Sequence, residues 1–77
     1  KGDYRRAIVH YQKAHEYEPK AEYLFFVARN QDLAYKDKRI ALKQYEQYLA
    51  TKDEKYRKYA EDRIRQLKET IHFQSGR

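Results

Sequence analysis

The side chains that most often bind metals are few in this sequence, and their spacing does not suit a metal site. His10, His15 and His72 are the three histidines, and there are no cysteines. No two histidines stand at the i, i+4 spacing that places zinc ligands on one face of a helix. We therefore expect no bound metal, and we expect His15, one helical turn after Tyr11, to lie at the edge of a packed core.

Nucleophilic catalysis also lacks its components. Ser75 is the only serine, and no G-x-S-x-G, P-loop or G-x-G-x-x-G motif is present. The adjacent carboxylates Glu61 and Asp62 point apart on a helix, which does not suit a general acid and base acting on one substrate. We expect a protein that is not an enzyme and that needs no cofactor.

Composition indicates folded, solvated helices that favour acidic partners. The 77 residues suit a single domain, and 18 basic against 12 acidic residues give a net charge of +6. Charges of both signs are interleaved with regularly spaced apolar residues, which argues against disorder. A basic surface favours acidic partners in general. No apolar run approaches the roughly 20 residues of a membrane span, so we expect none.

Apolar spacing predicts four helices joined by short turns, over residues 3–18, 20–35, 37–50 and 54–73. Asp3 is a suitable N-cap for the first helix, and Pro19 marks its end. The first half of the second helix, YLFFVA at 23–28, is apolar almost all round, so this helix should have neighbours on more than one side. The fourth helix is apolar along a narrow seam and should finish the stack, with 74–77 as a frayed end broken at Gly76.

Two of the predicted helices repeat at a fixed distance. Ala7 and Ala41 are 34 residues apart, and the same shift brings Tyr11 onto Tyr45. A period of about 34 residues is that of the tetratricopeptide repeat. Residues 2–19 resemble the second helix of such a repeat through its turn, its small residues, its aromatic residue and its closing proline, namely Gly2, Asp3, Tyr4, Ala7, Tyr11, Ala14 and Pro19.

The resemblance implies an all-α fold in which antiparallel helix hairpins stack as a short right-handed α-solenoid with a C-terminal capping helix. Residues 1–19 would be the second helix of a truncated repeat, 20–51 a second repeat, and 52–77 the capping helix and tail. The chain would then be a C-terminal fragment of a repeat array.

Several residues of the second repeat depart from the family pattern. Arg29 and Lys36 stand where glycine is usual, and Asp32 stands where tyrosine is usual. Tyr48 replaces a small residue, and Asp53 occupies the position of the closing proline. The period and the helix lengths therefore carry the resemblance through this part of the chain.

The resemblance also implies a concave groove, lined by the first helix of each repeat, that binds a protein or peptide. Its floor would be aromatic, Asn30 would hold a peptide backbone, and a basic flank would meet acidic side chains or a C-terminal carboxylate. The positions that carry over are Tyr23, Phe26, Asn30, Leu33 and Ala34 from the second helix, and Lys55, Lys58, Asp62 and Arg65 from the fourth. The alternative is that Tyr23 and Phe26 merely pack against a missing neighbour.

Two other classes of function stay open. A nucleic-acid-binding module would use the basic cluster of Lys36, Lys38, Arg39 and Lys43 on phosphates. The cluster is short and other charges are interleaved, which favours a solubilising turn. The other alternative is a purely structural cap or self-association segment. Because the preceding helix of the repeat is missing, we predict that the helix over 3–18 forms a homodimer contact or is the least stable part.

Overall fold

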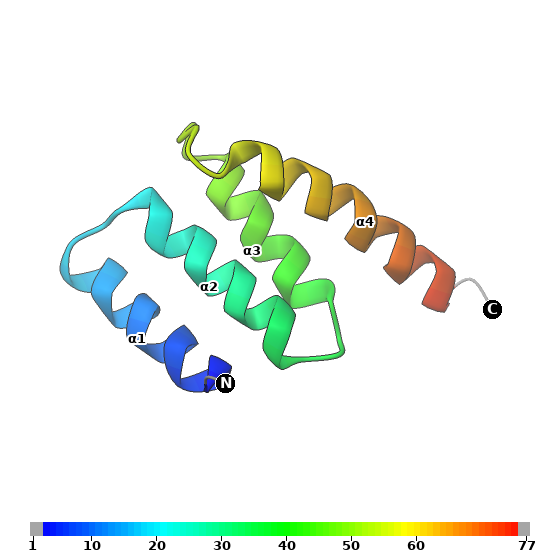
Figure 1. Ribbon diagram of the computed structural model, residues 1–77, viewed down its shortest axis with the longest axis horizontal. Coiled ribbons are helices and arrows are strands. Elements are labelled where there is room, and N and C mark those ends of the chain that lie inside the picture. Colours follow the sequence, from blue (N-terminus) through cyan, green and yellow to red (C-terminus); the bar gives the residue numbers. More distant parts are fainter. Residues whose placement is uncertain (1–2, 76–77) are drawn as a thin grey trace.

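The computed structural model describes residues 3–75, and these form four α-helices and no strand. The helices are α1 (Tyr4–Tyr17), α2 (Ala21–Ala34), α3 (Arg39–Leu49) and α4 (Arg57–Ser75). Each helix packs against the one before it, so that α2 lies between α1 and α3, and α4 packs on α3 (Figure 1). The described chain is therefore a small all-α domain of four sequentially packed helices, and α2 has the two neighbours that its apolar surface predicts. The expected turn at Gly2 and helix breaker at Gly76 lie outside the described residues.

The helix ends agree with the predicted ones at α1 and differ at α4. The Asp3 carboxylate accepts a hydrogen bond from the Arg6 backbone N–H at 3.2 Å, so Asp3 is the N-cap of α1 as predicted. By contrast, α4 begins at Arg57 and continues to Ser75, where we expected 54–73. The backbone of residues 74 and 75 is thus helical, and the expectation that these two residues fray is wrong.

A hydrogen-bonded turn delays the start of α4. The Asp53 carboxylate accepts hydrogen bonds from the Tyr48 hydroxyl at 2.6 Å and from the Lys55 backbone N–H at 3.2 Å. The Tyr48 hydroxyl in turn accepts a bond from the Tyr56 backbone N–H at 2.8 Å. These bonds give the backbone N–H groups of Lys55 and Tyr56 their acceptors within a turn. Asp53 therefore caps this turn, and the helix begins after it.

The core lies where α2, α3 and α4 meet, and Phe25 is at its centre. The Phe25 side chain is 5% exposed, and its ring stacks on Tyr56 with centroids 4.3 Å apart. The same ring also contacts Tyr45, Tyr48 and Tyr59. Fully buried alanines, whose small side chains let helices approach closely, complete the core at Ala28, Ala41 and Ala60.

α1 packs along α2 through a single stripe. Ile8 is buried, and Tyr11 and Ala14 are half-buried, whereas Val9 on the other side of the helix is 50% exposed. This arrangement leaves one side of α1 uncovered within the described chain. That this side forms a homodimer, or that α1 is the least stable helix, stays a prediction.

Lys52, just after α3, has a positive φ of 71°. Glycine adopts this left-handed conformation without the steric cost that a Cβ atom brings. We predict that Lys52→Gly raises the free energy of unfolding by about 0.5–1 kcal/mol, measured by urea denaturation. The matched control is Lys36→Gly in the α2–α3 loop, where φ is not positive and the same change should lower stability. Equal effects in the two variants would contradict the argument.

Candidate functional site

A buried carboxylate joins α2 to α4. Asp32 is 6% exposed, and Arg63 of α4 donates two hydrogen bonds to it, from Nε to Oδ2 at 2.6 Å and from Nη2 to Oδ1 at 2.9 Å. The two residues are 31 positions apart in the sequence. A bidentate arginine–carboxylate pair is strong and directional, so this pair fixes α4 relative to α2.

Two more side chains complete what we name the Asp32 cluster, namely Asp32, Lys38, Tyr45 and Arg63. The Tyr45 hydroxyl donates to Asp32 Oδ2 at 3.1 Å, and Lys38 Nζ lies 3.2 Å from Oδ1. Burial alone raises the pKa of the Asp32 carboxyl, but the hydrogen bonds and charge of Arg63, with Lys38 and Tyr45, outweigh it, so the pKa lies below its ordinary value. Burial and the nearby carboxylate raise the pKa of the Tyr45 hydroxyl, which therefore remains a donor. The cluster is suited to holding helices together rather than to transferring protons.

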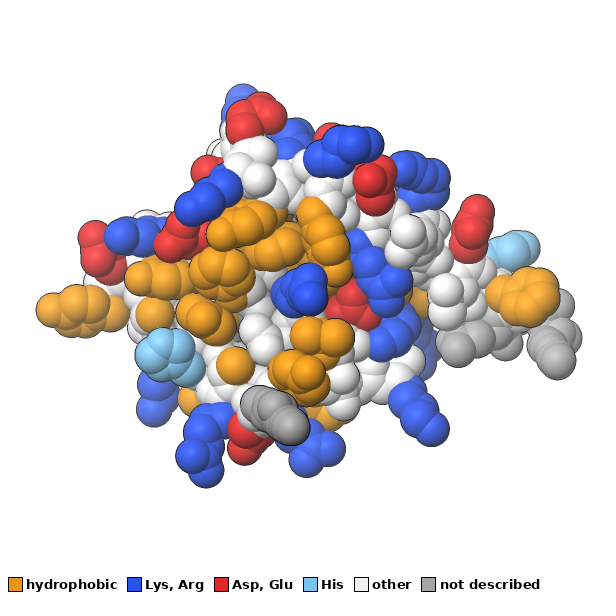
Figure 2. Space-filling view, viewed as in Figure 1, with side chains coloured by type: hydrophobic (Ala, Val, Ile, Leu, Met, Phe, Trp, Pro, Cys, Tyr) orange, Lys and Arg blue, Asp and Glu red, His pale blue; other side chains and the backbone are white. Residues whose placement is uncertain are grey.

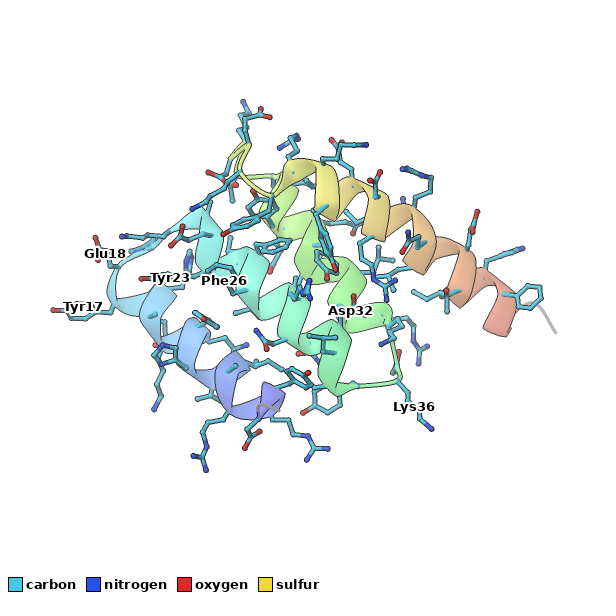
Figure 3. The ribbon with its side chains drawn as sticks, in the orientation of Figure 1. Tyr17, Glu18, Tyr23, Phe26, Asp32 and Lys36 are labelled. Atoms are coloured by element: carbon cyan, nitrogen blue, oxygen red, sulfur yellow. The ribbon has the colours of Figure 1, made fainter. Side chains whose placement is uncertain are left out.

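Hydrophobic side chains gather on one face of the molecule, over α1, α2 and the start of α4 (Figure 2). We name this surface the aromatic face and define it as Tyr11, Tyr23, Phe26, Tyr56 and Tyr59. The Tyr11 ring lies 6.1 Å from Tyr23 and 5.0 Å from Phe26, and Phe26 lies 5.5 Å from Tyr56. Figure 3 shows Tyr23 and Phe26 side by side on α2. Rings from three parts of the chain therefore form one continuous surface.

Arg29 extends from α2 to the edge of the aromatic face. Its Nη1 donates a hydrogen bond to the Tyr59 hydroxyl at 3.0 Å, and its guanidinium carbon lies 5.2 Å from the centroid of the Tyr59 ring. Arg29 replaces the glycine that is usual in the repeat pattern, yet the close packing in the core falls on the neighbouring Ala28 and on Ala41. The arginine is thus directed toward α4 and leaves the core contact undisturbed.

The predicted groove residues of α2 lie on or beside the aromatic face. Tyr23 and Phe26 belong to it and are half-buried, so they are neither fully packed nor fully exposed. Asn30 Nδ2 donates to the Phe26 carbonyl at 2.8 Å within the same helix. Further along α2, Leu33 is 49% exposed and Ala34 is half-buried. The amide of Asn30 is therefore partly engaged before any peptide arrives.

Lys55 is the predicted groove residue from the C-terminal part of the chain that lies at the aromatic face. Its Nζ is 5.5 Å from the centroid of the Tyr56 ring and 3.8 Å from Glu22 Oε1. The side chain is 63% exposed, so a bound carboxylate can reach its ammonium group.

Lys58 and Arg65 are placed elsewhere. Both pair with Asp62, at 3.5 Å and 2.6 Å respectively, and both are exposed. They lie about 100° and 120° around α4 from Tyr59, away from the buried seam that includes Ile64. Lys58 and Arg65 therefore project from another side of α4 than Tyr59, and Asp62 is engaged with both of them.

The basic cluster at the α2–α3 turn is largely engaged within the molecule. Lys38 belongs to the Asp32 cluster, and Arg39 donates to the Asp37 carboxylate at 3.0 and 2.8 Å. The side-chain and backbone hydrogen bonds from Arg39 lower the pKa of Asp37 to about 2. Two of the four cations thus already face a carboxylate, and Lys36 and Lys43 are exposed cations outside these two pairs.

His15 lies at the edge of the packing between α1 and the following turn. It is half-buried, and its Nδ1 accepts a hydrogen bond from the Lys20 backbone N–H at 3.2 Å. Within residues 3–75, no three or more His, Asp and Glu side chains are placed to hold a metal ion. No helix in the same range has both the length and the apolar character needed to cross a membrane.

Sequence reasoning missed Arg63 and Tyr59 as partners of α2. Their contacts with Asp32 and Arg29 join residues 31 and 30 positions apart, and no local pattern reports such pairs. The available signal was the departure of Asp32 and Arg29 from the repeat pattern. A buried carboxylate needs hydrogen-bond donors or a cation beside it, and Arg63 of α4 supplies both.

No family model, no curated protein and no solved structure matches this chain. The class of this protein is therefore described from its fold and its site. It is a small all-α domain whose exposed chemistry is an aromatic surface next to an arginine and a lysine.

Proposed function

We propose that this chain is a non-catalytic protein–protein interaction module that binds a peptide or partner domain through the aromatic face. It is a tetratricopeptide-like segment of a larger repeat scaffold, in which antiparallel hairpins form a short right-handed α-solenoid and α4 is the capping helix. The 34-residue separation of Ala7 and Ala41 supports this, as do four helices packed in chain order.

The aromatic face is the observation that carries the proposal. Tyr59 is 42% exposed, and the other four rings are half-buried. Tyrosine, phenylalanine and arginine are enriched at protein interfaces, because rigid rings contribute a large contact area at a low cost in conformational entropy. The buried Phe25 lies against Phe26, Tyr56 and Tyr59 and holds them in place. A surface held in this way loses little further freedom when a partner binds.

Arg29 and Lys55 favour an acidic partner. The Arg29 guanidinium is planar and held against Tyr59, and a planar fork of donors suits a carboxylate. Lys55 adds an exposed ammonium group beside Tyr56, with the Glu22 carboxylate 3.8 Å away. An Asp or Glu side chain next to an apolar residue would therefore meet a cation and a ring together. The net charge of +6 acts in the same direction over longer distances.

A nucleic-acid-binding module and a purely structural cap are the less favoured alternatives. Phosphate binding needs several available cations on one face. Here Lys38 and Arg39 face carboxylates, and Lys58 and Arg65 share Asp62. A purely structural role does not explain why the rings of the aromatic face remain partly exposed.

Peptide titration tests the proposal. Fluorescent ten-residue peptides that combine Asp or Glu with one apolar residue would be titrated against the chain, with neutral peptides beside them. We expect the acidic peptides to bind, and we expect Lys55→Glu and Tyr59→Ser each to weaken binding about tenfold, which is the effect of losing about 1.4 kcal/mol of binding free energy.

The matched controls are Lys68→Glu on the exposed surface of α4 and Tyr17→Ser, whose side chain is 92% exposed at the end of α1. Both should leave the affinity unchanged. The proposal fails if no peptide binds, or if the control variants weaken binding as much as the variants on the aromatic face.

A further inference from the structure

A hollow lies between the first half of α1, the end of α2 and the start of α3. Its volume is about 410 Å³, and its apolar wall is formed by Ile8 and Val9 of α1, Tyr35 after α2 and Ile40 of α3. We name it the Val9–Ile40 slot. It lies within the ~300–1,000 Å³ typical of binding pockets and can take one or two large apolar side chains.

The slot exposes aliphatic side chains that the fold does not use. Val9 is 50% and Ile40 is 52% exposed, while Ile8 between them and the core is 7% exposed. Val9 is two residues from Tyr11, so it projects about 200° around α1 from the aromatic face. The slot is therefore a separate surface, and it needs an explanation of its own.

Cations bracket the two exposed aliphatic side chains. Val9 has Arg5 and Lys13 one turn to either side of it on α1. Ile40 has Lys36 four residues before it and Lys43 three residues after it. Figure 3 shows Lys36 extending outward from the loop that follows α2. Arg5 lines the slot, and the exposed Lys13 and Lys43 lie one turn from Val9 and Ile40 on the same helix faces, so positive charge lies beside the apolar wall.

The one carboxylate at the slot does not reverse this charge. Asp37 lines the hollow, but it is held by Arg39 in a pair with N–O distances of 3.0 and 2.8 Å. The pair carries no net charge, and the excess of positive charge beside the apolar wall remains.

We propose that the Val9–Ile40 slot docks an acidic amphipathic helix of a partner protein. One or two apolar side chains of that helix enter the hollow, and glutamates or aspartates along its flanks face Arg5, Lys13 and Lys43. A second copy of this chain, which is the partner predicted for the uncovered side of α1, is disfavoured at this slot, because it would bring like charges against each other. A membrane surface also fits poorly, because the apolar side chains line a hollow instead of projecting from the surface. The inference does not depend on the aromatic face.

The test uses three synthetic sixteen-residue helical peptides. The first has leucines at i, i+3 and i+7 on a glutamate-rich helix, the second is a scrambled peptide of the same composition, and the third carries lysine in place of glutamate. The measurements use the chain with Lys55→Glu and Tyr59→Ser, whose aromatic face should no longer bind acidic peptides. In this background we expect only the first peptide to bind, with an affinity that falls as salt is raised. Val9→Glu and Ile40→Glu should each weaken binding about tenfold or more, and Lys43→Glu about threefold.

Lys68→Glu on the exposed surface of α4 is the control, and it should leave this binding unchanged. Circular dichroism of each variant establishes that the helices remain. Equal binding of the scrambled peptide, or unchanged affinity in Val9→Glu, overturns the proposal. So does a dimer in sedimentation that Val9→Glu abolishes, or Val9-dependent binding to vesicles of anionic lipid in place of the peptide.

Discussion

Replacing Asp32 with asparagine is expected to lower the free energy of unfolding by about 3 kcal/mol, at the lower end of the cost of removing one partner from a buried ion pair. The substitution keeps the side-chain volume but leaves Arg63 and Lys38 without the carboxylate that they share. The lower end applies because the Arg63 side chain keeps 30% of its surface exposed. Chemical denaturation followed by circular dichroism measures the loss.

Asp37→Asn is the matched control, because Asp37 also forms a bidentate pair with an arginine but is exposed. It should hardly move the unfolding midpoint.

Unfolding at low pH gives a second readout. The folded pKa of Asp32 is below its ordinary value, so its stabilisation is present above about pH 4 and is lost as the pH falls through the lowered pKa. Asp32→Asn should lack that part of the acid loss. If the two asparagine variants lose the same stability, the Asp32 cluster does not hold α4 in place.

Phe25→Ala is expected to lower the free energy of unfolding by about 3–5 kcal/mol, the usual cost of removing a buried aromatic ring. Phe25 stacks on Tyr56 and contacts Tyr45, Tyr48 and Tyr59, so its removal opens a cavity between α2, α3 and α4. A domain of this size has a small total stability, so the loss is a large fraction of it. Thermal unfolding measures it.

Two further variants make this result specific. Phe25→Leu keeps an apolar side chain but loses the stacked ring, so its stability should lie between those of the wild type and Phe25→Ala. Phe73→Ala is the control on an 83% exposed ring of α4 and should change stability little. A loss at Phe73 as large as that at Phe25 would show that the core is not centred where the structure places it.

Most of the fold was predictable because it rests on local signals. The spacing of apolar residues gave α1 and α2 to within about one residue at each end, and Asp3 is the N-cap that the sequence indicates. The start of α4 was not predictable in the same way. It depends on the Tyr48 hydroxyl bonding to Asp53 and to the Tyr56 N–H, and the position of that hydroxyl is set by the packing of α3.

The part of the site that could be predicted is the side that α2 provides, together with Lys55 before α4. Tyr23 and Phe26 follow from the helical register and the resemblance to the repeat family. The contribution of α4 depends on contacts across about 30 positions, which bring Tyr59 to Arg29 and Arg63 to Asp32. Arg29 and Asp32 are two of the residues that depart from the repeat pattern, and both have partners on α4. The departures are therefore related to each other, since together they tie α4 to α2.

The aromatic face is proposed as a peptide-binding surface. The most direct test is a nuclear magnetic resonance titration of the nitrogen-15-labelled chain with an acidic peptide that contains proline. Such a peptide stays extended, so it does not probe the helix-binding slot. We predict that backbone shift changes concentrate at residues 23–33 of α2 and at residues 55–59, which span the end of the turn before α4 and the first residues of that helix. Shift changes confined to α1 and α3 would contradict this proposal. So would the absence of any shift change at peptide concentrations well above that of the labelled chain.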